Sequence, residues 1–170
     1  MITSSLSLPL VTLRNTGTDD LDYILAAEQH VENRSFIVPW TRDEHSRSFS
    51  DPNCAHLIVE AETRVGYLIL FGLRDPNKSI EFRRIVITEK GHGLGSATVL
   101  QVQRLVFETY NAHRLWLDVK VQNRRARSIY EKAGFTVEGT LRECLRSGND
   151  YESLVVMSIL RQEYDVQRNA

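Results

Sequence analysis

Apolar and polar residues alternate along the chain in short blocks that predict strands in its first half. Apolar blocks rich in β-branched residues lie at 10–14, 56–61, 65–73 and 79–87, and polar turns separate the last three. Strands joined by short turns are typical of an antiparallel meander. We therefore expect the first half of the chain to build an antiparallel sheet.

The second half of the chain predicts a crossover followed by a hairpin. Residues 94–110 contain no proline and are expected to form a long helix between the strand at 79–87 and another strand at 114–119. A strand, a helix and a strand in this order form a crossover, so the two strands should pair in parallel. Two further strands are expected at 135–145 and 151–160, joined by a hairpin loop at 146–150.

Three other helices are expected to begin at capping residues. Thr18, followed by two acidic residues, starts a helix; its expected inner face carries Leu21, Ile24, Leu25 and Val31. Thr41-Arg42-Asp43-Glu44 has the capping-box spacing and starts a second helix, which reaches about Phe49. Residues 123–133 form the third, which Gly134 ends. The fold class is thus mixed α/β: a mostly antiparallel central sheet with one parallel crossover, flanked by about four helices, in a single domain over residues 1–170.

Composition excludes several classes of protein. Of the 170 residues, 42% are hydrophobic and 25% charged, as in ordinary globular proteins, and the net charge of −1 gives no bulk attraction to nucleic acid. No stretch approaches the ~18 apolar residues of a membrane span, and residues 1–10 lack the features of a signal peptide. Cys54 and Cys144 are far apart in sequence, which argues against a scaffold held by disulfides. We therefore expect the protein to reside in a reducing compartment, the cytoplasm. Cys54 and His56 are too few for a metal site.

A glycine-rich stretch between the strand at 79–87 and the long helix is the main candidate site. Gly91, Gly93 and Gly95 occupy alternate positions, where the absence of a Cβ lets a ligand approach the backbone. The helix that starts at Leu94 offers free amide groups at its N terminus, which favour an anion such as phosphate.

Two other phosphate-binding loops were weighed for this stretch. The loop of nucleotide triphosphatases needs a lysine followed by serine or threonine, whereas Gly95 is followed by Ser96 and Ala97, which excludes it. A dinucleotide site is the second alternative, with Asp118 at the end of the next strand as the ribose-binding acid. The GxGxG spacing and the preceding antiparallel strands argue against a dinucleotide fold.

Two motifs together resemble the GNAT superfamily of N-acetyltransferases. Lys90-Gly91-His92-Gly93-Leu94-Gly95 resembles the [Arg/Gln]-x-x-Gly-x-[Gly/Ala] pyrophosphate loop of that superfamily, with lysine in the first position. The run from Asn123 to Phe135 resembles its N-x-x-A-x-x-[LIV]-Y-x-K-x-G-F signature. The C-terminal half is similar to the branch with ribosomal-protein N-terminal acetyltransferases and spermidine acetyltransferases, in Glu138-Gly139, Leu141-Arg142-Glu143 and Gly148-Asn149-Asp150-Tyr151.

The resemblance implies a site for acetyl-CoA and assigns residues to it. Backbone amides at the end of the strand would hydrogen-bond pantetheine, the loop would hold the pyrophosphate, and Asn123 would hold the pantetheine arm while capping its helix. Tyr130 would also protonate the thiolate of coenzyme A; the alternative is that Tyr130 only packs its helix onto the sheet. The cofactor-binding residues so implied are Ile85, Val86, Ile87, Lys90, Gly91, His92, Gly93, Leu94, Gly95, Ser96, Asn123, Arg127 and Tyr130. His92 is expected to be exposed and non-catalytic.

Three arginines open the helix at 123–133, where positive charge opposes the helix dipole. A phosphate of coenzyme A would offset this for Arg124, Arg125 or Arg127; the alternative is a solvated basic face. A basic stripe with aromatic residues, as in nucleic-acid-binding proteins, is absent from the sequence.

The chemistry implied is attack of a primary amine on an acetyl thioester. Such an amine, with a pKa of ~10.4, is protonated at neutral pH and needs a base. The resemblance favours Glu81, which by alternation shares a face with Arg83 and Ile87 unless a bulge changes the alternation. Glu28 and Glu32 are the rivals, and an exposed helix face is the simpler interpretation of either.

The leading hypothesis is an acetyl-CoA-dependent N-acetyltransferase that acts by direct attack in a ternary complex. The acceptor would be a protein N terminus, a polyamine or another small amine, and a homodimer is compatible with the resemblance. Neither cysteine lies near the two motifs, so no acyl-cysteine intermediate is expected. The alternative is a non-catalytic module that binds acyl-CoA. Trp40 and Trp116 are expected in the core; for Trp40 the alternative is a place in the lining of the acceptor pocket.

Overall fold

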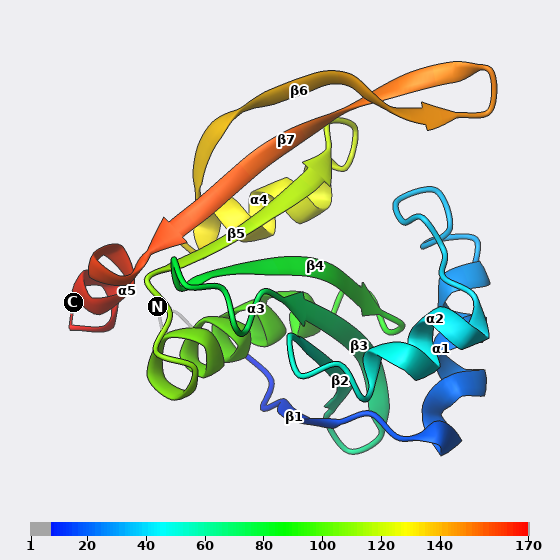
Figure 1. Ribbon diagram of the computed structural model, residues 1–170, viewed down its shortest axis with the longest axis horizontal. Coiled ribbons are helices and arrows are strands. Elements are labelled where there is room, and N and C mark those ends of the chain that lie inside the picture. The colour runs from blue at the N-terminus through cyan, green and yellow to red at the C-terminus, as the bar shows by residue number, and fades with distance from the viewer. Residues whose placement is uncertain (1–7, 170) are drawn as a thin grey trace, which may run out of the picture.

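The computed structural model describes residues 8–169, and within them seven strands form one sheet in the order β1-β2-β3-β4-β5-β7-β6 (Figure 1). The predicted meander and crossover are confirmed, because every neighbouring pair is antiparallel except the parallel pair β4–β5. The strands are β1 (Thr12–Asn15), β2 (Cys54–Glu60), β3 (Arg64–Phe71), β4 (Ser79–Ile87), β5 (Arg114–Lys120), β6 (Thr136–Ser147) and β7 (Asp150–Leu160).

Helices lie on both faces of the sheet. The α-helices among the described residues are α1 (Leu21–Gln29), α2 (Arg42–Ser48), α3 (Leu94–Arg104), α4 (Arg124–Lys132) and α5 (Arg161–Arg168). A single long helix was expected at 94–110; in the structure α3 ends at Arg104 and a π-helical turn, Leu105–Thr109, follows it. A 3₁₀ turn, Thr18–Asp20, precedes α1. The α5 helix was not predicted; its Tyr164 ring stacks on Phe107 with ring centroids 4.9 Å apart.

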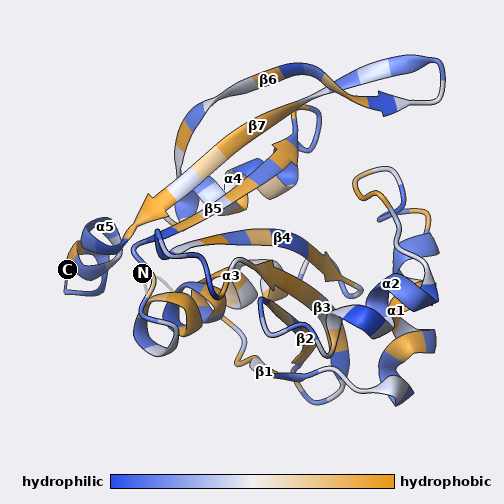
Figure 2. Ribbon diagram, viewed as in Figure 1, coloured by the Kyte–Doolittle hydropathy of each residue, from blue (hydrophilic) through white to orange (hydrophobic). Residues whose placement is uncertain are grey.

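Two apolar clusters make the core, one on each face of the sheet. The larger contains residues of α3, α4 and α5, and the smaller packs α1 on Tyr67, Ile69 and Val86. The middle of β3 is buried on both faces, which agrees with its continuous apolar colouring in Figure 2. Val31, expected on the inner face of the first helix, is 64% exposed because α1 ends at Gln29.

A β-bulge at Arg83 changes which face the end of β4 presents. Ile69 of β3 pairs with Arg84 and Leu70 pairs with Phe82, so Arg83 has no partner in the ladder. Phe82 therefore faces the larger cluster, whereas Val86 faces the smaller one. The prediction that Glu81 and Ile87 lie on one face of the sheet is therefore wrong, because the bulge interrupts the alternation of side chains along β4.

The strands β4 and β5 separate after a short parallel contact. They pair only at Ser79–Glu81 with Arg114–Trp116, after which β4 pairs with β3 alone and β5 with β7 alone. The sheet therefore opens into a wedge between the two strands (Figure 1). Beyond Glu81, no strand of the described part of the chain occupies the β5-facing edge of β4, so its backbone groups there are available.

The β6–β7 hairpin extends away from the rest of the sheet (Figure 1). Its turn is tighter than expected, because Arg146 pairs with Tyr151 and Ser147 with Asp150. Nearly all of β6 is exposed, including the apolar Val137 and Leu141. No helix within residues 8–169 has the length and apolar character that crossing a membrane requires.

Candidate active site

A cavity of about 690 Å³ lies where the wedge, the glycine loop and α4 meet. Of the residues assigned from the sequence, those that line it are Ile85, Val86, Ile87, Lys90, Gly91, Gly93, Leu94, Gly95, Ser96, Asn123 and Tyr130. The sequence motifs, far apart along the chain, are therefore brought to one place. His92, Arg127 and Glu81 are not among the lining residues, and His92 is exposed as expected.

The glycine loop adopts backbone angles that favour glycine. Gly91 has φ of 90° and Gly93 has φ of 74°, in the left-handed region where a Cβ is strained. Gly93 is the N-cap of α3 and supplies no side-chain cap. The amide groups of the first turn of α3 thus face the cavity with a bare backbone, which suits an anionic group.

Lys90 has a more specific position than the motif implied. Its Nζ donates to the Oδ1 atom of Asn33 at 2.6 Å and to the carbonyl of Ile87 at 3.1 Å. Burial lowers the pKa of this ammonium group. Lys90 therefore lines the cavity and also ties the glycine loop to the segment between α1 and α2.

The α4 helix contributes Asn123 and Tyr130. The Oδ1 atom of Asn123 accepts from the amide of Ala126 at 3.2 Å, so the residue caps the helix as expected. Tyr130 is only 6% exposed and packs against Phe82 and Phe135, yet it lines the cavity. Burial, with a smaller contribution from the charge of Asp118, raises the pKa of its hydroxyl. Tyr130 therefore packs α4 onto the sheet and also lines the cavity, so the two roles considered from the sequence are compatible.

Among the three arginines of α4, it is Arg125 that lines the cavity, together with Lys132. The Arg127 guanidinium lies 3.9 Å from the Glu131 carboxylate, one turn further along the helix. The structure therefore brings Arg125, rather than Arg127, to the glycine loop.

The three carboxylates considered as bases have separate environments. Glu81 faces a different hollow, of about 440 Å³, which Phe71 and Trp116 also line, and it pairs with Arg83 at 2.6 Å. Glu32 is exposed at the rim of the main cavity. Glu28 was expected on an exposed face, and this expectation is wrong because its side chain is only 1% exposed.

Asp118 is a titratable residue that the sequence suggested only as a ribose ligand. Its side chain is exposed, but partial desolvation, and then the charge of Glu81, raise its pKa, and its own charge raises the pKa of Tyr130. Leu117 and Val119, its neighbours in β5, belong to the larger apolar cluster, so Asp118 lies on the opposite face, as Glu81 does. Glu81 pairs with Trp116 at the end of the parallel contact between β4 and β5. Asp118 follows Trp116 by two residues, so it lies where the two strands begin to separate.

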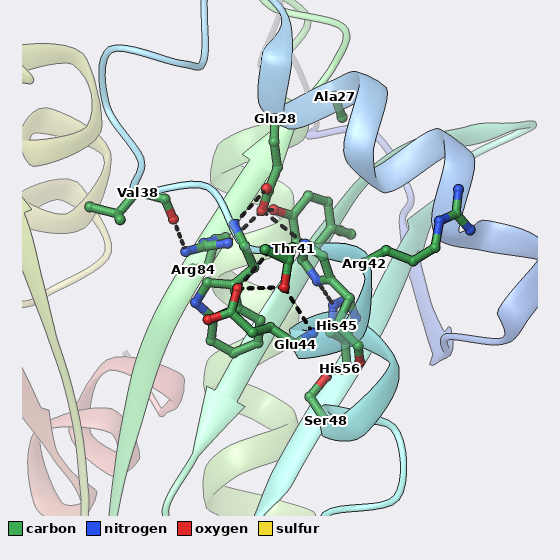
Figure 3. Close-up of polar contacts among 12 residues, drawn as sticks. Ala27, Glu28, Val38, Thr41, Arg42, Glu44, His45, Ser48, His56 and Arg84 are labelled. Atoms are coloured by element: carbon green, nitrogen blue, oxygen red, sulfur yellow. Dashed lines mark hydrogen bonds and ion pairs between the residues drawn. The ribbon is translucent and has the colours of Figure 1, made fainter.

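A buried polar cluster outside the cavity lining includes Glu28, His45, His56 and Arg84 (Figure 3). The buried Tyr67 hydroxyl belongs to the same cluster. The carboxylate of Glu28 accepts from Arg84 and from the Tyr67 hydroxyl, and His45 Nε2 lies 3.2 Å from it. Burial raises the pKa of Glu28, but the hydrogen bonds from His45 and Tyr67 and the charge of Arg84 outweigh it, so the pKa is lowered overall.

The sequence contained a signal for this cluster. Glu28 lies one turn after Ile24 and two turns after Leu21, both of them buried apolar residues of α1. A carboxylate on the apolar stripe of a helix indicates a buried partner. In the described part of the chain, no group of three or more His, Cys, Asp and Glu side chains is placed to hold a metal ion.

Comparisons with known proteins agree with these motifs. A family model described as "Acetyltransferase (GNAT) domain" matches residues 11–136. The spermidine N(1)-acetyltransferase of Escherichia coli K12 is 26% identical over 167 residues, which cover 91% of this chain and 88% of the relative. A putative [ribosomal protein bS18]-alanine N-acetyltransferase of Bacillus subtilis is 27% identical over 146 residues, 85% of this chain and 92% of the relative.

A solved structure shares the fold over nearly its whole length. It is the spermidine N-acetyltransferase of Vibrio cholerae in complex with CoA and spermine, with a TM-score of 0.82 and 26% identity. The superposition covers 91% of this chain and 97% of that chain.

Proposed function

Because the chain belongs to the GNAT family of acetyl-CoA-dependent N-acetyltransferases, we propose that its acceptor is a polyamine or another small primary amine. The observation that supports acetyl transfer at this site is the meeting of the β4 edge, the glycine loop and Tyr130 around one cavity. The similarity to spermidine acetyltransferases over most of the chain supports the acceptor class. A protein N terminus is the competing acceptor, which the relative from B. subtilis represents.

We assign binding of acetyl-CoA to the wedge and the glycine loop. The free edge of β4 at Ile85–Ile87 offers backbone groups to the amides of a pantetheine chain. The first turn of α3 offers amides to a pyrophosphate, and Arg125 and Lys132 add positive charge beside it. The volume of the cavity lies within the usual range of ligand sites, roughly 300–1,000 Å³. When bound, the co-substrate supplies an acetyl thioester.

We propose that Tyr130 is the general acid. Its burial keeps the hydroxyl protonated at neutral pH, because the raised pKa disfavours the phenolate. A protonated hydroxyl at the end of the wedge can donate its proton to a departing thiolate. Asp118 strengthens this effect, because its negative charge also disfavours the phenolate.

We propose that Glu81 and Asp118 together remove the proton of the acceptor amine. Both carboxylates stand outside the cavity lining, so they would act on the amine through water. The raised pKa of Asp118 makes it a stronger proton acceptor than an ordinary aspartate. The amine would then attack the thioester directly, without an acyl-cysteine intermediate: Cys144 lies on β6 and Cys54 on β2, and burial raises the pKa of the Cys54 thiol to about 11.

A thiol-release assay with acetyl-CoA and a panel of amines tests the proposal. We expect turnover with spermidine or spermine and much slower turnover with a peptide that begins with alanine. The opposite order would move the acceptor class to protein N termini. Tight binding of coenzyme A with no turnover of any amine would favour the non-catalytic alternative.

Three further properties are part of the proposal. We infer one acetyltransferase domain over residues 1–170, which the single sheet and the family match support. The free state of Cys54 and Cys144 supports a cytoplasmic location. Exposed apolar side chains on the β6–β7 hairpin, among them Val137, Leu141 and Tyr151, support a homodimer, which light scattering would test.

A further inference from the structure

The segment 33–40 forms one wall of the cavity but has no regular structure of its own. Phe36 and Ile37 of this segment line the cavity together with Asn33. The segment contains turns and no helix or strand. Its position must therefore be set by contacts from other elements.

Side chains from four places in the fold bind this wall segment. Lys90 of the glycine loop donates to Asn33 at 2.6 Å, and Lys120 of β5 donates to the carbonyl of Ser35 at 2.8 Å. Arg84 of β4 donates to the carbonyl of Val38. Glu28 of α1 accepts from the amide of Trp40 at 3.0 Å. Three of these bonds go to backbone atoms, so they fix the path of the chain rather than one side chain.

The two bonds at the C-terminal end of the wall come from one buried ion pair. The side chains of Glu28 and Arg84 are 1% and 7% exposed, and they hydrogen-bond each other (Figure 3). The Arg84 guanidinium also lies over the ring of Trp40, 4.9 Å from its centroid. The bulge at Arg83 makes this possible, because it turns Arg84 toward α1.

Two histidines extend the ion pair from Glu28 toward Thr16 on the other side of the cluster. His45 Nδ1 lies 3.0 Å from His56 Nε2, and His56 Nδ1 lies 2.9 Å from the Thr16 hydroxyl. The contacts thus run in one line from the Thr16 hydroxyl through His56 and His45 to Glu28, whose carboxylate lies 3.2 Å from His45 Nε2. A carboxylate with this many partners is held in one position.

We propose that Glu28 and Arg84 are positioning residues for the acceptor amine. They hold the wall segment 33–40 against β4, so that the acceptor binds between this wall and the opening of the wedge. This inference rests on the proposed function. The first turn of α3 and α4, to which we assign the pyrophosphate, lie outside the ion pair and its partners. The pantetheine-binding groups at Ile85–Ile87, next to Arg84, are backbone groups held by pairing with β3, which the substitutions keep. Breaking the pair should therefore weaken acceptor binding and leave coenzyme A binding nearly unchanged.

The test compares Glu28→Gln and Arg84→Met with a matched control, Asp20→Asn. Asp20 is also a buried carboxylate, and it pairs with Arg14 at 2.7 Å and with Arg64 at 3.2 Å. Its hydrogen-bond partners, Arg14, Arg64 and the amide of Gly17, lie outside the wall segment, so we expect Asp20→Asn to destabilise the fold without releasing the wall. For each variant we would measure Tm, coenzyme A affinity by calorimetry, and kcat and KM for the acceptor at saturating acetyl-CoA.

We expect the acceptor KM to rise about tenfold or more in both ion-pair variants, with coenzyme A affinity within about twofold of wild type. Asp20→Asn should lower Tm by a similar amount and leave the acceptor KM unchanged. An equal rise of KM in Asp20→Asn, or an equal loss of coenzyme A affinity in the ion-pair variants, would overturn the proposal and leave the pair a purely structural feature.

Two further measurements keep the proposal falsifiable. Hydrogen exchange of the amides of 33–40 should accelerate in Glu28→Gln and not in Asp20→Asn, whether or not a polyamine is the acceptor. Unchanged exchange would overturn the proposal independently of the proposed function. If the ion-pair variants do not fold, Lys120→Met removes the bond to Ser35. Glu152→Gln is its control, because it removes the charge that pairs with Lys120 and keeps an oxygen that can accept from Gln122. We expect a smaller rise in KM, about threefold, for Lys120→Met only; an unchanged KM would contradict the proposal.

Discussion

Arg83 and Arg84 are neighbours in β4, yet their guanidinium groups lie on the same face of the sheet. The Cζ atom of Arg83 lies 4.4 Å from the centroid of the Phe71 ring, and the Cζ atom of Arg84 lies 4.9 Å from the centroid of the Trp40 ring. In a regular strand two successive side chains would point to opposite faces; the bulge at Arg83 removes this alternation. One arginine therefore pairs with Glu81 at the wedge and the other with buried Glu28.

The pairing of Glu81 with Arg83 bears on the identity of the base. We expect Asp118→Asn and Glu81→Gln each to lower kcat/KM by about a hundredfold, the low end of general-base effects. The Glu81 charge raises the pKa of Asp118, so its removal lowers that pKa and moves the acid limb of the pH–rate profile to lower pH. Glu32→Gln, at the rim of the cavity, is the control and should change little. Full activity in both wedge variants would place the base elsewhere.

The left-handed backbone at Gly93 makes the glycine loop sensitive to a single methyl group. Alanine there has an unfavourable φ and its Cβ would lie 3.2 Å from Pro9. The strain, about 1–2 kcal/mol, should appear as a fall in coenzyme A affinity of about tenfold or more, measured by calorimetry. Gly139→Ala, in open space on β6, should leave the affinity unchanged. Wild-type affinity in Gly93→Ala would contradict the assignment of the loop to the pyrophosphate.

Arg125 and Arg127 differ in their position relative to the cavity. We expect Arg125→Ala to weaken coenzyme A binding by about tenfold, because a charge-assisted hydrogen bond to phosphate contributes about 1.5–3 kcal/mol. Arg127→Ala should have a much smaller effect, since Arg127 lies beside Glu131 outside the cavity lining. Titrations at low and high salt would show the difference shrinking as the phosphate charge is screened. The reverse order of effects would restore Arg127 as the phosphate ligand.

Buried His56 predicts a loss of stability in mild acid. Burial, and then the charges of His45 and Arg84, lower its pKa from 6.5 to about 3, whereas Glu28 and Asp20 oppose this effect. The unfolded chain therefore binds a proton that the folded chain excludes. The neutral His56 therefore contributes its full share to the free energy of unfolding above pH 6.5. As the pH falls from 6.5 toward 3 this free energy decreases, by up to about 1.4 kcal/mol per pH unit.

Urea unfolding between pH 7 and pH 4 measures this loss. His56→Gln keeps a polar side chain without the titration, so its stability should fall less steeply than that of the wild type. His92→Gln, on the exposed loop, should follow the wild-type curve. Parallel curves for wild type and His56→Gln would show that His56 does not exclude the proton.

Local patterns were sufficient to predict most elements of the fold. The bounds of β4 agree with the predicted strand, and Thr41 and Glu44 form the expected capping box. The parallel crossover followed from the order of elements, and the two motifs gave most of the cavity lining. Each of these features depends on residues close together in sequence.

Features that depend on the pairing of distant segments were not predictable in the same way. The bulge at Arg83 is defined by its register with β3, and the wedge by where β5 leaves β4. The helix α5 is fixed by Tyr164 on Phe107, a contact between distant parts of the chain. Whether Arg125 or Arg127 reaches the loop depends on the rotation of α4, which its own sequence leaves open. The burial of Glu28 was readable from its spacing to Ile24, but its partners were not.

Tyr130 is the residue on which the central claim depends. We expect Tyr130→Phe to lower kcat for acetyl transfer to spermidine by about a hundredfold or more, because it removes one hydroxyl and keeps the buried ring. Coenzyme A affinity and Tm should stay close to wild type. The most direct measurement is thiol release by both proteins at saturating acetyl-CoA. A large loss of kcat with unchanged affinity is the predicted result, and an unchanged kcat would contradict the assignment of Tyr130 as the general acid.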